Sequence, residues 1–379
     1  MKTIRIAGIR SFVLAAALSV GLGSLSPAFA ATTVIVNPDG KLTYLGTLGG
    51  RYGSATGIND AGQVVGYSET TGGIRHAFIT GPNGVGMTDL GTLGKSWSPS
   101  SAYGINNAGQ VVGSSYIIGG NFHAFITGPN GAGMTDLGTL GGRYSFAYGI
   151  NDAGQVVGYS ETAGGRFHAF ITGPNGAGMT DLGTLGGDDS AAIDINDAGQ
   201  VTGHSYITEG NFHAFITGPN GVGMTDLGTL GGNESSARSI NDAGQVVGYS
   251  EAIGGSYDAF ITGPNGVGMA ELSIPSASSI SATGINDAGQ VVGSSSTAAW
   301  THHAFITGPN GVGMTDLNSY VNLPDGLYLG EAIDINNRGQ VLATIIPEPA
   351  SYALMLAGLG LVGFTVRRRK AAENNARTV

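Results

Sequence analysis

The chain has 379 residues, which is enough for one large domain or two ordinary ones. Glycine supplies 68 residues, about 18% of the chain against an average near 7%, and charged residues supply 11% against roughly 25%. The 41% of apolar residues can form a core, and the lack of a Gly-x-y period excludes collagen. The lack of cysteine excludes disulfides, thiol nucleophiles and cysteine-ligated metals, and the net charge of −10 argues against nucleic-acid binding.

Residues 1–30 have the three parts of a secretory signal peptide. Three basic residues occur among the first ten, and an apolar stretch follows at residues 12–25. Ala28 and Ala30 supply the small side chains that signal peptidase accepts, so we predict cleavage before Ala31. The alternative is an uncleaved N-terminal membrane anchor.

Internal repeats fill the chain between its two ends. An Ile-Asn-(Asp/Asn) triplet recurs at intervals of 45 to 50 residues, beginning at Ile58, Ile105, Ile150, Ile195, Ile240, Ile285 and Ile335. A His-Ala-Phe triplet begins at His76, His123, His168, His213 and His303, and Asp258-Ala259-Phe260 occupies the remaining slot. A Gly-Pro-Asn-Gly turn follows each of these six triplets. Repeats of this length indicate a solenoid or a propeller.

One unit, residues 143–187, shows the expected local structure. Short runs rich in apolar and β-branched residues occupy 145–151, 155–160, 167–172 and 179–185, and we predict a strand in each. Glycine-containing turns separate the runs, and a Gly-Gly pair at 186–187 punctuates the end of the unit. No stretch is long enough or free enough of glycine to favour a helix.

Four short strands in about 45 residues are typical of one β-propeller blade, and a β-solenoid is the alternative. Residues 33–50 align with the second half of a unit, and residues 331–345 align with the first half. The two ends therefore supply complementary halves of a single blade. We predict an all-β, seven-bladed propeller over residues 31–346, closed by the pairing of these half-units, because closure removes exposed strand edges.

The repeats resemble the HAF family of bacterial extracellular repeats. The resemblance rests on the His-Ala-Phe triplets and on the Asp-Leu-Gly-Thr-Leu-Gly run, seen at residues 136–141 and 181–186. It implies an exported repeat protein and defines no activity. Departures occur at Asp258 and at residues 271–273 and 316–318, so a function that needs identical units is in doubt.

The C-terminal segment carries a second targeting pattern. Pro347, Glu348 and Pro349 precede seventeen uncharged residues at 350–366, and a basic cluster follows at Arg367, Arg368, Arg369 and Lys370. Seventeen helical residues rise about 26 Å, so we predict a single transmembrane helix with the basic cluster on the cytoplasmic side. Residues 371–379 form a short cytoplasmic tail.

The segment 347–370 resembles the PEP-CTERM sorting signal of Gram-negative bacteria. The Pro-Glu-Pro triplet, the apolar helix and the basic cluster occur in the order of that signal. The resemblance implies processing by an exosortase near Pro347–Pro349, after transient anchoring in the inner membrane, and a final place on the cell surface or in the extracellular matrix. A plain membrane anchor is the alternative.

The exported core gives weak signals for metal binding. Residues 31–346 contain eight Lys/Arg and twenty-four Asp/Glu, a difference of −16, which repels anionic polymers and lipid headgroups. The repeated Asn-Asp-Ala-Gly turn could supply oxygens to Ca²⁺, but each turn carries one carboxylate and Ca²⁺ takes six to eight oxygens. We therefore interpret the turn as structural and assign no metal or cofactor. The triplet histidines belong to different blades, so we expect them to pack or to hydrogen-bond across a strand pair.

Catalytic motifs are also missing from the sequence. There is no Gly-x-Ser-x-Gly elbow and no phosphate-binding loop, and we assign no catalytic residue. Paired carboxylates of a hydrolase or lyase that acts on polysaccharide remain the enzymatic alternative. Trp97 and Trp300, the only tryptophans, are candidates for stacking on sugars, and ordinary blade packing is the other interpretation.

The sequence thus favours an exported, non-enzymatic binding or scaffolding protein of the cell envelope or matrix. Signal peptidase and exosortase are its expected partners during export, and exopolysaccharide or a surface protein is the expected partner afterwards, in a role linked to biofilm. A matrix component without a discrete ligand fits the same residues.

Overall fold

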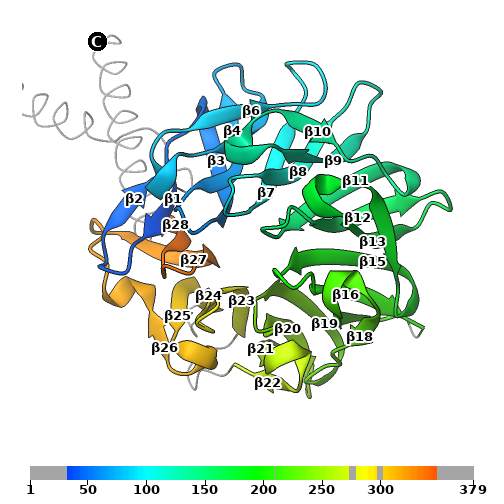
Figure 1. Ribbon diagram of the computed structural model, residues 1–379. Helices are drawn as coiled ribbons and strands as arrows, with labels where there is room; N and C mark the ends of the chain where they lie inside the picture. Colours follow the sequence, from blue (N-terminus) through cyan, green and yellow to red (C-terminus); the bar gives the residue numbers. More distant parts are fainter. Residues whose placement is uncertain (1–31, 209, 273–278, 297–301, 348–379) are drawn as a thin grey trace, which may run out of the picture. The chain divides into compact units, whose positions relative to one another are not determined.

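The computed structural model describes residues 32–208, 210–272, 279–296 and 302–347. These residues form 28 strands and seven one-turn 3-10 segments. The strands make seven four-stranded antiparallel sheets arranged as blades around a central channel (Figure 1). The seven-bladed propeller predicted from the repeats is confirmed. Within the described residues no helix has the length and apolarity needed to cross a membrane, and the predicted helix at 350–366 lies outside them.

Each of blades 1 to 6 is one continuous stretch of chain whose first strand lines the channel. Blade 1 contains β3 (Gly49–Ile58), β4 (Val64–Thr70), β5 (Arg75–Ile79) and β6 (Thr88–Gly91). Blade 2 contains β7 (Ser100–Ile105), β8 (Val111–Tyr116), β9 (Phe122–Thr127) and β10 (Met134–Asp136). Blade 3 contains β11 (Gly141–Ile150), β12 (Val156–Thr162), β13 (Phe167–Thr172) and β14 (Met179–Gly183).

Blade 4 contains β15 (Gly186–Ile195), β16 (Val201–Ile207), β17 (Phe212–Thr217) and β18 (Met224–Asp226). Blade 5 contains β19 (Gly231–Ile240), β20 (Val246–Ala252), β21 (Tyr257–Thr262) and β22 (Met269–Glu271). Blade 6 contains β23 (Ser279–Ile285), β24 (Val291–Ser296), β25 (His302–Thr307) and β26 (Met314–Asp316). The Gly-Pro-Asn-Gly turns contain the 3-10 segments η1 to η6, for example η3 (Pro174–Gly176), and η7 (Leu317–Ser319) follows β26.

Blade 7 combines the two ends of the propeller. Its strand order is β2 (Leu42–Tyr44), β1 (Thr32–Val36), β28 (Val341–Pro347) and β27 (Leu327–Ile335). Val34 pairs with Ala343 across the junction, where the blue and orange strands meet in Figure 1. The N-terminal half-unit therefore completes the C-terminal one, as the alignment of the half-units predicts.

The hydrophobic core is divided into seven layers, each between two neighbouring blades. A buried phenylalanine on the third strand of blades 1 to 6 anchors these layers, and Phe78 packs against Ile35 and Leu342 of blade 7. Blade 7 has the smaller Val34 in the corresponding position. Leu317 and Leu329, both fully buried, pack into the same cluster as Val34 and fill the space.

The Gly-Gly pairs belong to strands, which corrects the prediction that they only punctuate the units. The first strand of blade 3 starts at Gly141 rather than at Ser145. A Cβ atom on Gly142 would lie 2.6 Å from the carbonyl oxygen of Glu161, so only glycine allows β12 to pass this close. The register between β11 and β12 is irregular at this point, which is typical of a bulge.

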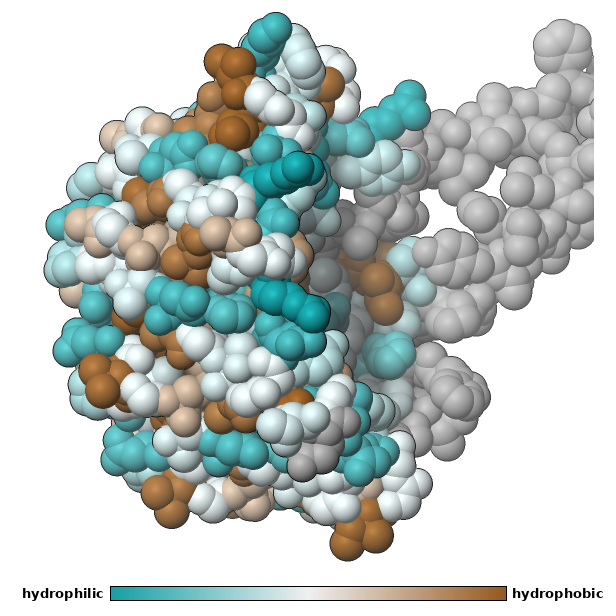
Figure 2. Space-filling model, turned by 90° about the vertical axis from the view of Figure 1, so that its right-hand side faces the viewer, coloured by the Kyte–Doolittle hydropathy of each residue, from teal (hydrophilic) through white to brown (hydrophobic). Residues whose placement is uncertain are grey.

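Figure 2 shows the rim of the propeller, where small groups of apolar residues are separated by polar ones. Exposed apolar side chains include the valines that follow four of the Pro-Asn-Gly turns, Val85, Val222, Val267 and Val312. Scattered exposed residues of this kind are ordinary for a soluble surface and do not form a docking surface.

Candidate functional site

The central channel has two ends that are built differently. In blade 1 the strands β3 and β4 are antiparallel, with Ile58 facing Val64 at one end and Gly49 facing Thr70 at the other. We call the end with the turns between first and second strands the turn mouth, and the end with the hairpins between second and third strands the hairpin mouth. The turn mouth contains a cavity of about 170 Å³, and a cavity of about 260 Å³ lies toward the hairpin mouth.

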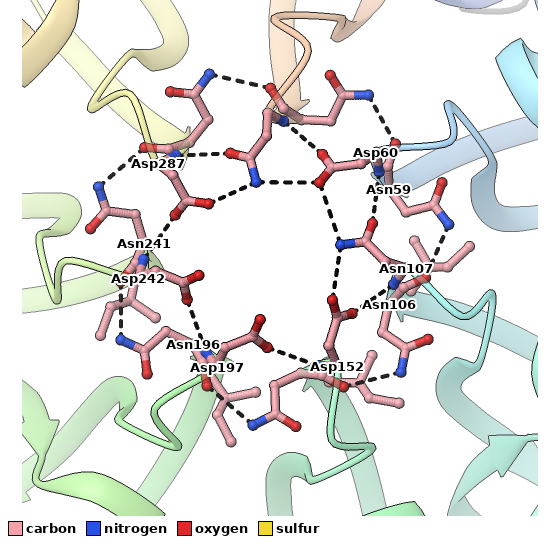
Figure 3. A pocket seen from close by; sticks show the side chains of 18 of the residues that line it. Asn59, Asp60, Asn106, Asn107, Asp152, Asn196, Asp197, Asn241, Asp242 and Asp287 are labelled. Atoms are coloured by element: carbon pink, nitrogen blue, oxygen red, sulfur yellow. Dashed lines mark hydrogen bonds between the residues drawn. The ribbon is translucent and has the colours of Figure 1, made fainter.

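A closed ring of asparagine side chains joins the blades at the turn mouth (Figure 3). Each Nδ2 donates a hydrogen bond of 2.9–3.2 Å to the backbone carbonyl of the equivalent asparagine in the next blade. The ring closes from Asn336 of blade 7 to Asn59 of blade 1. All seven side chains are buried: Asn59, Asn106, Asn151, Asn196, Asn241, Asn286 and Asn336.

A second ring is formed by the residue that follows each asparagine. Its backbone N–H donates to the side-chain Oδ1 of the equivalent residue in the next blade at 2.8–3.0 Å. Five members are aspartates and two are asparagines: Asp60, Asn107, Asp152, Asp197, Asp242, Asp287 and Asn337. Burial, and then the neighbouring carboxylates, raise the pKa of Asp242.

These rings give the repeated Ile-Asn-(Asp/Asn) triplet a structural role, because its polar groups bond to the neighbouring blades. Asn107 and Asn337 each donate an amide hydrogen to a flanking carboxylate, at 3.0 Å from Asp152 and 2.7 Å from Asp287. Among the described residues no three His, Cys, Asp or Glu side chains are grouped so that they could hold a metal ion. Calcium binding by the turns, the alternative to a structural turn, stays untested.

The cavity near the hairpin mouth is lined by positions at which the repeats differ. Every first strand contains the pattern Ala-x-x-Ile, and the Ala and the Ile are the same in all seven blades. The two positions between them line the cavity. They read Thr56-Gly57, Tyr103-Gly104, Tyr148-Gly149, Ile193-Asp194, Arg238-Ser239, Thr283-Gly284 and Ile333-Asp334.

Two aspartates replace the usual glycine of this pattern. Asp334 accepts backbone N–H groups from Ile335 at 2.8 Å and from Ile58 of the next blade at 3.0 Å. Asp194 accepts from Ile195, Ile240 and the Ser239 hydroxyl at 2.9–3.0 Å. Both side chains keep a partial opening to the channel. Removal from bulk water nevertheless raises the pKa of Asp194 to about 6 and that of Asp334 to about 7.

Tyrosine and arginine side chains complete the wall of this cavity. The ring centroids of Tyr103 and Tyr148, in neighbouring blades, are 5.0 Å apart. Burial raises the pKa of Tyr148 well above its ordinary range, so its hydroxyl stays protonated. Arg238 is exposed, and its guanidinium carbon lies 5.3 Å from the centroid of the Tyr249 ring. The cavity therefore offers aromatic faces, two carboxyl groups and one cation.

The triplet histidines form a separate set of contacts on the outer strands. In five blades the histidine Nδ1 lies 2.8–2.9 Å from an aspartate oxygen on the fourth strand, as in His76 and Asp89. In blade 5 both partners change together, to Asp258 and Glu271, and Asp258 accepts from Ser256 instead. The pairs lie in different blades and do not meet in one site. Their partners explain why the His-Ala-Phe and Asp-Leu-Gly motifs recur together.

The structure locates only some of the residues singled out in the sequence. Trp97 lies between β6 and β7, is 60% exposed, and has the Lys95 ammonium 5.5 Å from its ring centroid. Trp300 lies outside the described residues, as do Ala28, Ala30, Ala31, Glu348, Pro349 and the basic cluster 367–370. Pro347 ends β28. The sequence reasoning missed Asp194, Arg238 and Asp334, which a column-by-column comparison of the repeats would have found.

A family model, the PEP-CTERM protein-sorting motif, matches residues 346–370. The sorting signal predicted from the Pro-Glu-Pro triplet, the apolar segment and the basic cluster is therefore confirmed. A signal of this kind suggests export to the cell surface in Gram-negative bacteria. A search of curated proteins found no significant match to the chain.

Solved propeller structures resemble this one at low sequence identity. A puromycin-hydrolyzing peptidase of Mycobacterium tuberculosis is 13% identical, with a TM-score of 0.53 over 77% of this chain and 50% of its own. A structure from a study of two prolyl endopeptidases is 11% identical, with a TM-score of 0.54 over 79% of this chain and 44% of its own. The propeller domain of the Trilobed protease from Pyrococcus furiosus is 10% identical, with a TM-score of 0.50 over 76% of this chain and 88% of its own. This chain spans about half the length of the first two, and the likeness shows the fold alone.

The asparagine ring predicts that Asn196→Ala destabilises the propeller by about 2–3 kcal/mol. The substitution removes hydrogen bonds to Gln200 and to the carbonyl of Asn241 and leaves buried groups without partners. Urea denaturation measures the loss. Asn233→Ala, at an exposed position, serves as the control and should change stability by less than about 0.5 kcal/mol. Equal effects of the two substitutions would contradict the role of the ring.

The raised pKa values of Asp194 and Asp334 predict a pH-dependent contribution to stability. The folded state binds more protons than the unfolded state between about pH 4 and pH 7, so this contribution is full below about pH 4 and is lost as pH rises through about 6 and 7. Asp194→Asn or Asp334→Asn should therefore gain stability relative to the parent, by on the order of 1–2 kcal/mol, between pH 4 and pH 8.

Urea denaturation across this pH range tests the prediction. The exposed residue Asp325 provides the control, because Asp325→Asn should follow the parent at every pH. A constant difference between the Asp194→Asn variant and the parent across the range would contradict the assignment.

Proposed function

We propose that this protein is an exported propeller of the cell envelope or extracellular matrix, sorted by an exosortase, with a non-enzymatic binding or scaffolding role linked to exopolysaccharide and biofilm. The observation that carries the proposal is the sorting motif at residues 346–370, which begins within the last strand, β28. Removal of the chain beyond Pro347 leaves every strand of the propeller in place. A folded ring can therefore be delivered outside the cell whether it is released or attached.

Export of this kind agrees with the other signals in the chain. The signal peptide predicted at residues 1–30 supplies entry to the secretory route, and signal peptidase would be the first partner. The resemblance of the repeats to HAF repeats points to the same compartment. The lack of cysteine makes folding independent of the oxidising conditions outside the cytoplasm.

A binding role is supported by the way the residues are distributed. Polar residues that recur between the repeats bond to a neighbouring strand or blade, as the seven ring asparagines and the five histidine–aspartate pairs do. Residues that differ between blades line the cavity near the hairpin mouth. Variation of one wall of a rigid ring is a simple way to adapt a scaffold to a ligand, and the extended ligand expected outside the cell is polysaccharide.

An enzyme acting on extracellular polysaccharide is the second candidate. It is favoured by the two carboxyl groups of Asp194 and Asp334, which line one cavity and have raised pKa values. A carboxyl group that stays protonated near neutral pH is the usual general acid of a glycoside hydrolase. Both groups also accept backbone N–H groups from the next blade, which gives them a structural task.

Sedimentation with extracellular polysaccharide from the source bacterium separates these candidates. The purified protein is mixed with the polysaccharide, in calcium or in chelator, and the supernatant is assayed for newly formed sugar ends. We expect the protein to sediment with the polymer without release of sugar ends. Release that is lost in Asp194→Asn and Asp334→Asn would establish the enzyme instead. The lack of both binding and release would contradict the polysaccharide role.

A further inference from the structure

Sequence differences between the blades include the residues that face the cavity near the hairpin mouth. The alanine and isoleucine of the Ala-x-x-Ile pattern are buried or nearly so and serve the layers between blades, as Ala192 and Ile195 do. The two residues between them carry a cation, two carboxyl groups, two phenol rings and small residues in different blades. The turn mouth, in contrast, repeats one hydrogen-bonding pattern seven times. The wall of this cavity is therefore chemically asymmetric around the ring.

Charge also distinguishes the two ends. Five carboxylates surround the turn mouth. Six of the eight Lys and Arg residues in the propeller lie instead on the connections and strand ends at the hairpin side or on the cavity wall: Arg51, Arg75, Lys95, Arg143, Arg166 and Arg238. An anionic ligand is repelled from the turn mouth. Carboxylates also lie on the hairpin side, where Arg166 pairs with Asp188 and Asp189 and where Glu69 and Glu161 accept the backbone N–H groups of Arg51 and Arg143. The cation that an anionic ligand meets inside the cavity is therefore Arg238.

Arg238 is the cation placed to hold such a ligand. It is the only Lys or Arg that lines the cavity, and among the described residues it forms no ion pair. The guanidinium stacks on the Tyr249 ring, and this contact orients it and leaves its N–H groups available. A guanidinium of this kind binds a carboxylate through two parallel hydrogen bonds.

The remaining wall suits the rest of a sugar unit. Tyr148 packs between Tyr103 and Tyr159, so the sugar-facing ring is Tyr103, whose other face can pack against the C–H face of a pyranose. Asp334 accepts one hydrogen bond at each oxygen, and Asp194 accepts one at Oδ1 and two at Oδ2, so lone pairs remain on both Asp334 oxygens and on Asp194 Oδ1 for sugar hydroxyls. The volume of about 260 Å³ lies just below the roughly 300–1,000 Å³ of drug-sized pockets, so it fits one monosaccharide unit.

We infer that the hairpin mouth binds the terminal carboxylated sugar, a uronate, of an extracellular polysaccharide, with Arg238 on the carboxylate and Tyr103 against the ring. This assignment rests on the proposed polysaccharide-binding function and names the part of the polymer that is recognised. A chain end enters the channel, whereas an internal segment, flanked by sugars on both sides, does not fit a cavity of this size.

Ligand-observed NMR titration with glucuronate and with glucose tests the assignment, because the two sugars differ only at the carboxylate carbon. We expect the unaltered protein to bind glucuronate at least about tenfold more tightly than glucose. Arg238→Gln should remove that preference. Arg143→Gln, which removes an exposed cation on the same side of the propeller, should keep it. Urea denaturation of each variant verifies that it is folded.

Equal binding of glucuronate by the unaltered protein and by Arg238→Gln would overturn the assignment. Equal affinity for glucuronate and glucose in the unaltered protein would do the same. If the protein sediments with polysaccharide but binds neither sugar at the hairpin mouth, the inference fails and the proposed function survives. If it neither sediments with the polymer nor binds either sugar, both fail.

Discussion

The hydrogen bond from each buried asparagine amide to the next blade is the constraint on which the rest of this propeller depends. It fixes the end of every channel-lining strand against its neighbour, and it closes from Asn336 of blade 7 to Asn59 of blade 1. The pairing of β1 with β28 completes blade 7. Glycine between the strands follows from the same close approach, because a Cβ on Gly104 would meet the carbonyl oxygen of Tyr148 at 2.4 Å. Ring closure, the glycines at these close approaches and the repeated triplet therefore all serve the packing of each blade against the next.

The ring at one mouth leaves the other mouth free to vary. Residues such as Asn196 and Gln200 bond to each other and across blades, so a change in one copy disturbs two blades. The positions around Asp194 and Arg238 line the cavity near the hairpin mouth, and they differ from blade to blade. Asymmetry arises at the hairpin mouth for this reason, and a site that recognises one kind of ligand needs such asymmetry. A scaffold held rigid at one end can present different side chains at the other without loss of order.

Much of the fold could be predicted from the sequence because its signals are local and repeated. The complementary half-units at residues 33–50 and 331–345 define the seventh blade, since only a closed ring uses them. The Gly-Gly pairs were misjudged because their place in a strand depends on how closely Glu161 passes, which no local pattern encodes. The site was missed for a related reason. Asp194 and Arg238 look like isolated departures from the repeat, and only the ring geometry brings them to one cavity. Trp97, chosen for its chemistry alone, lies outside that cavity.

The most direct test of this account is a crystal structure of the protein soaked with glucuronate. The account predicts electron density for one sugar near the hairpin mouth, with its carboxylate against the Arg238 guanidinium and its ring beside Tyr103. The asparagine ring at the turn mouth should be unchanged. Density on the rim or within the turn mouth, with the hairpin mouth empty, would contradict the division of the channel into one structural end and one recognition end.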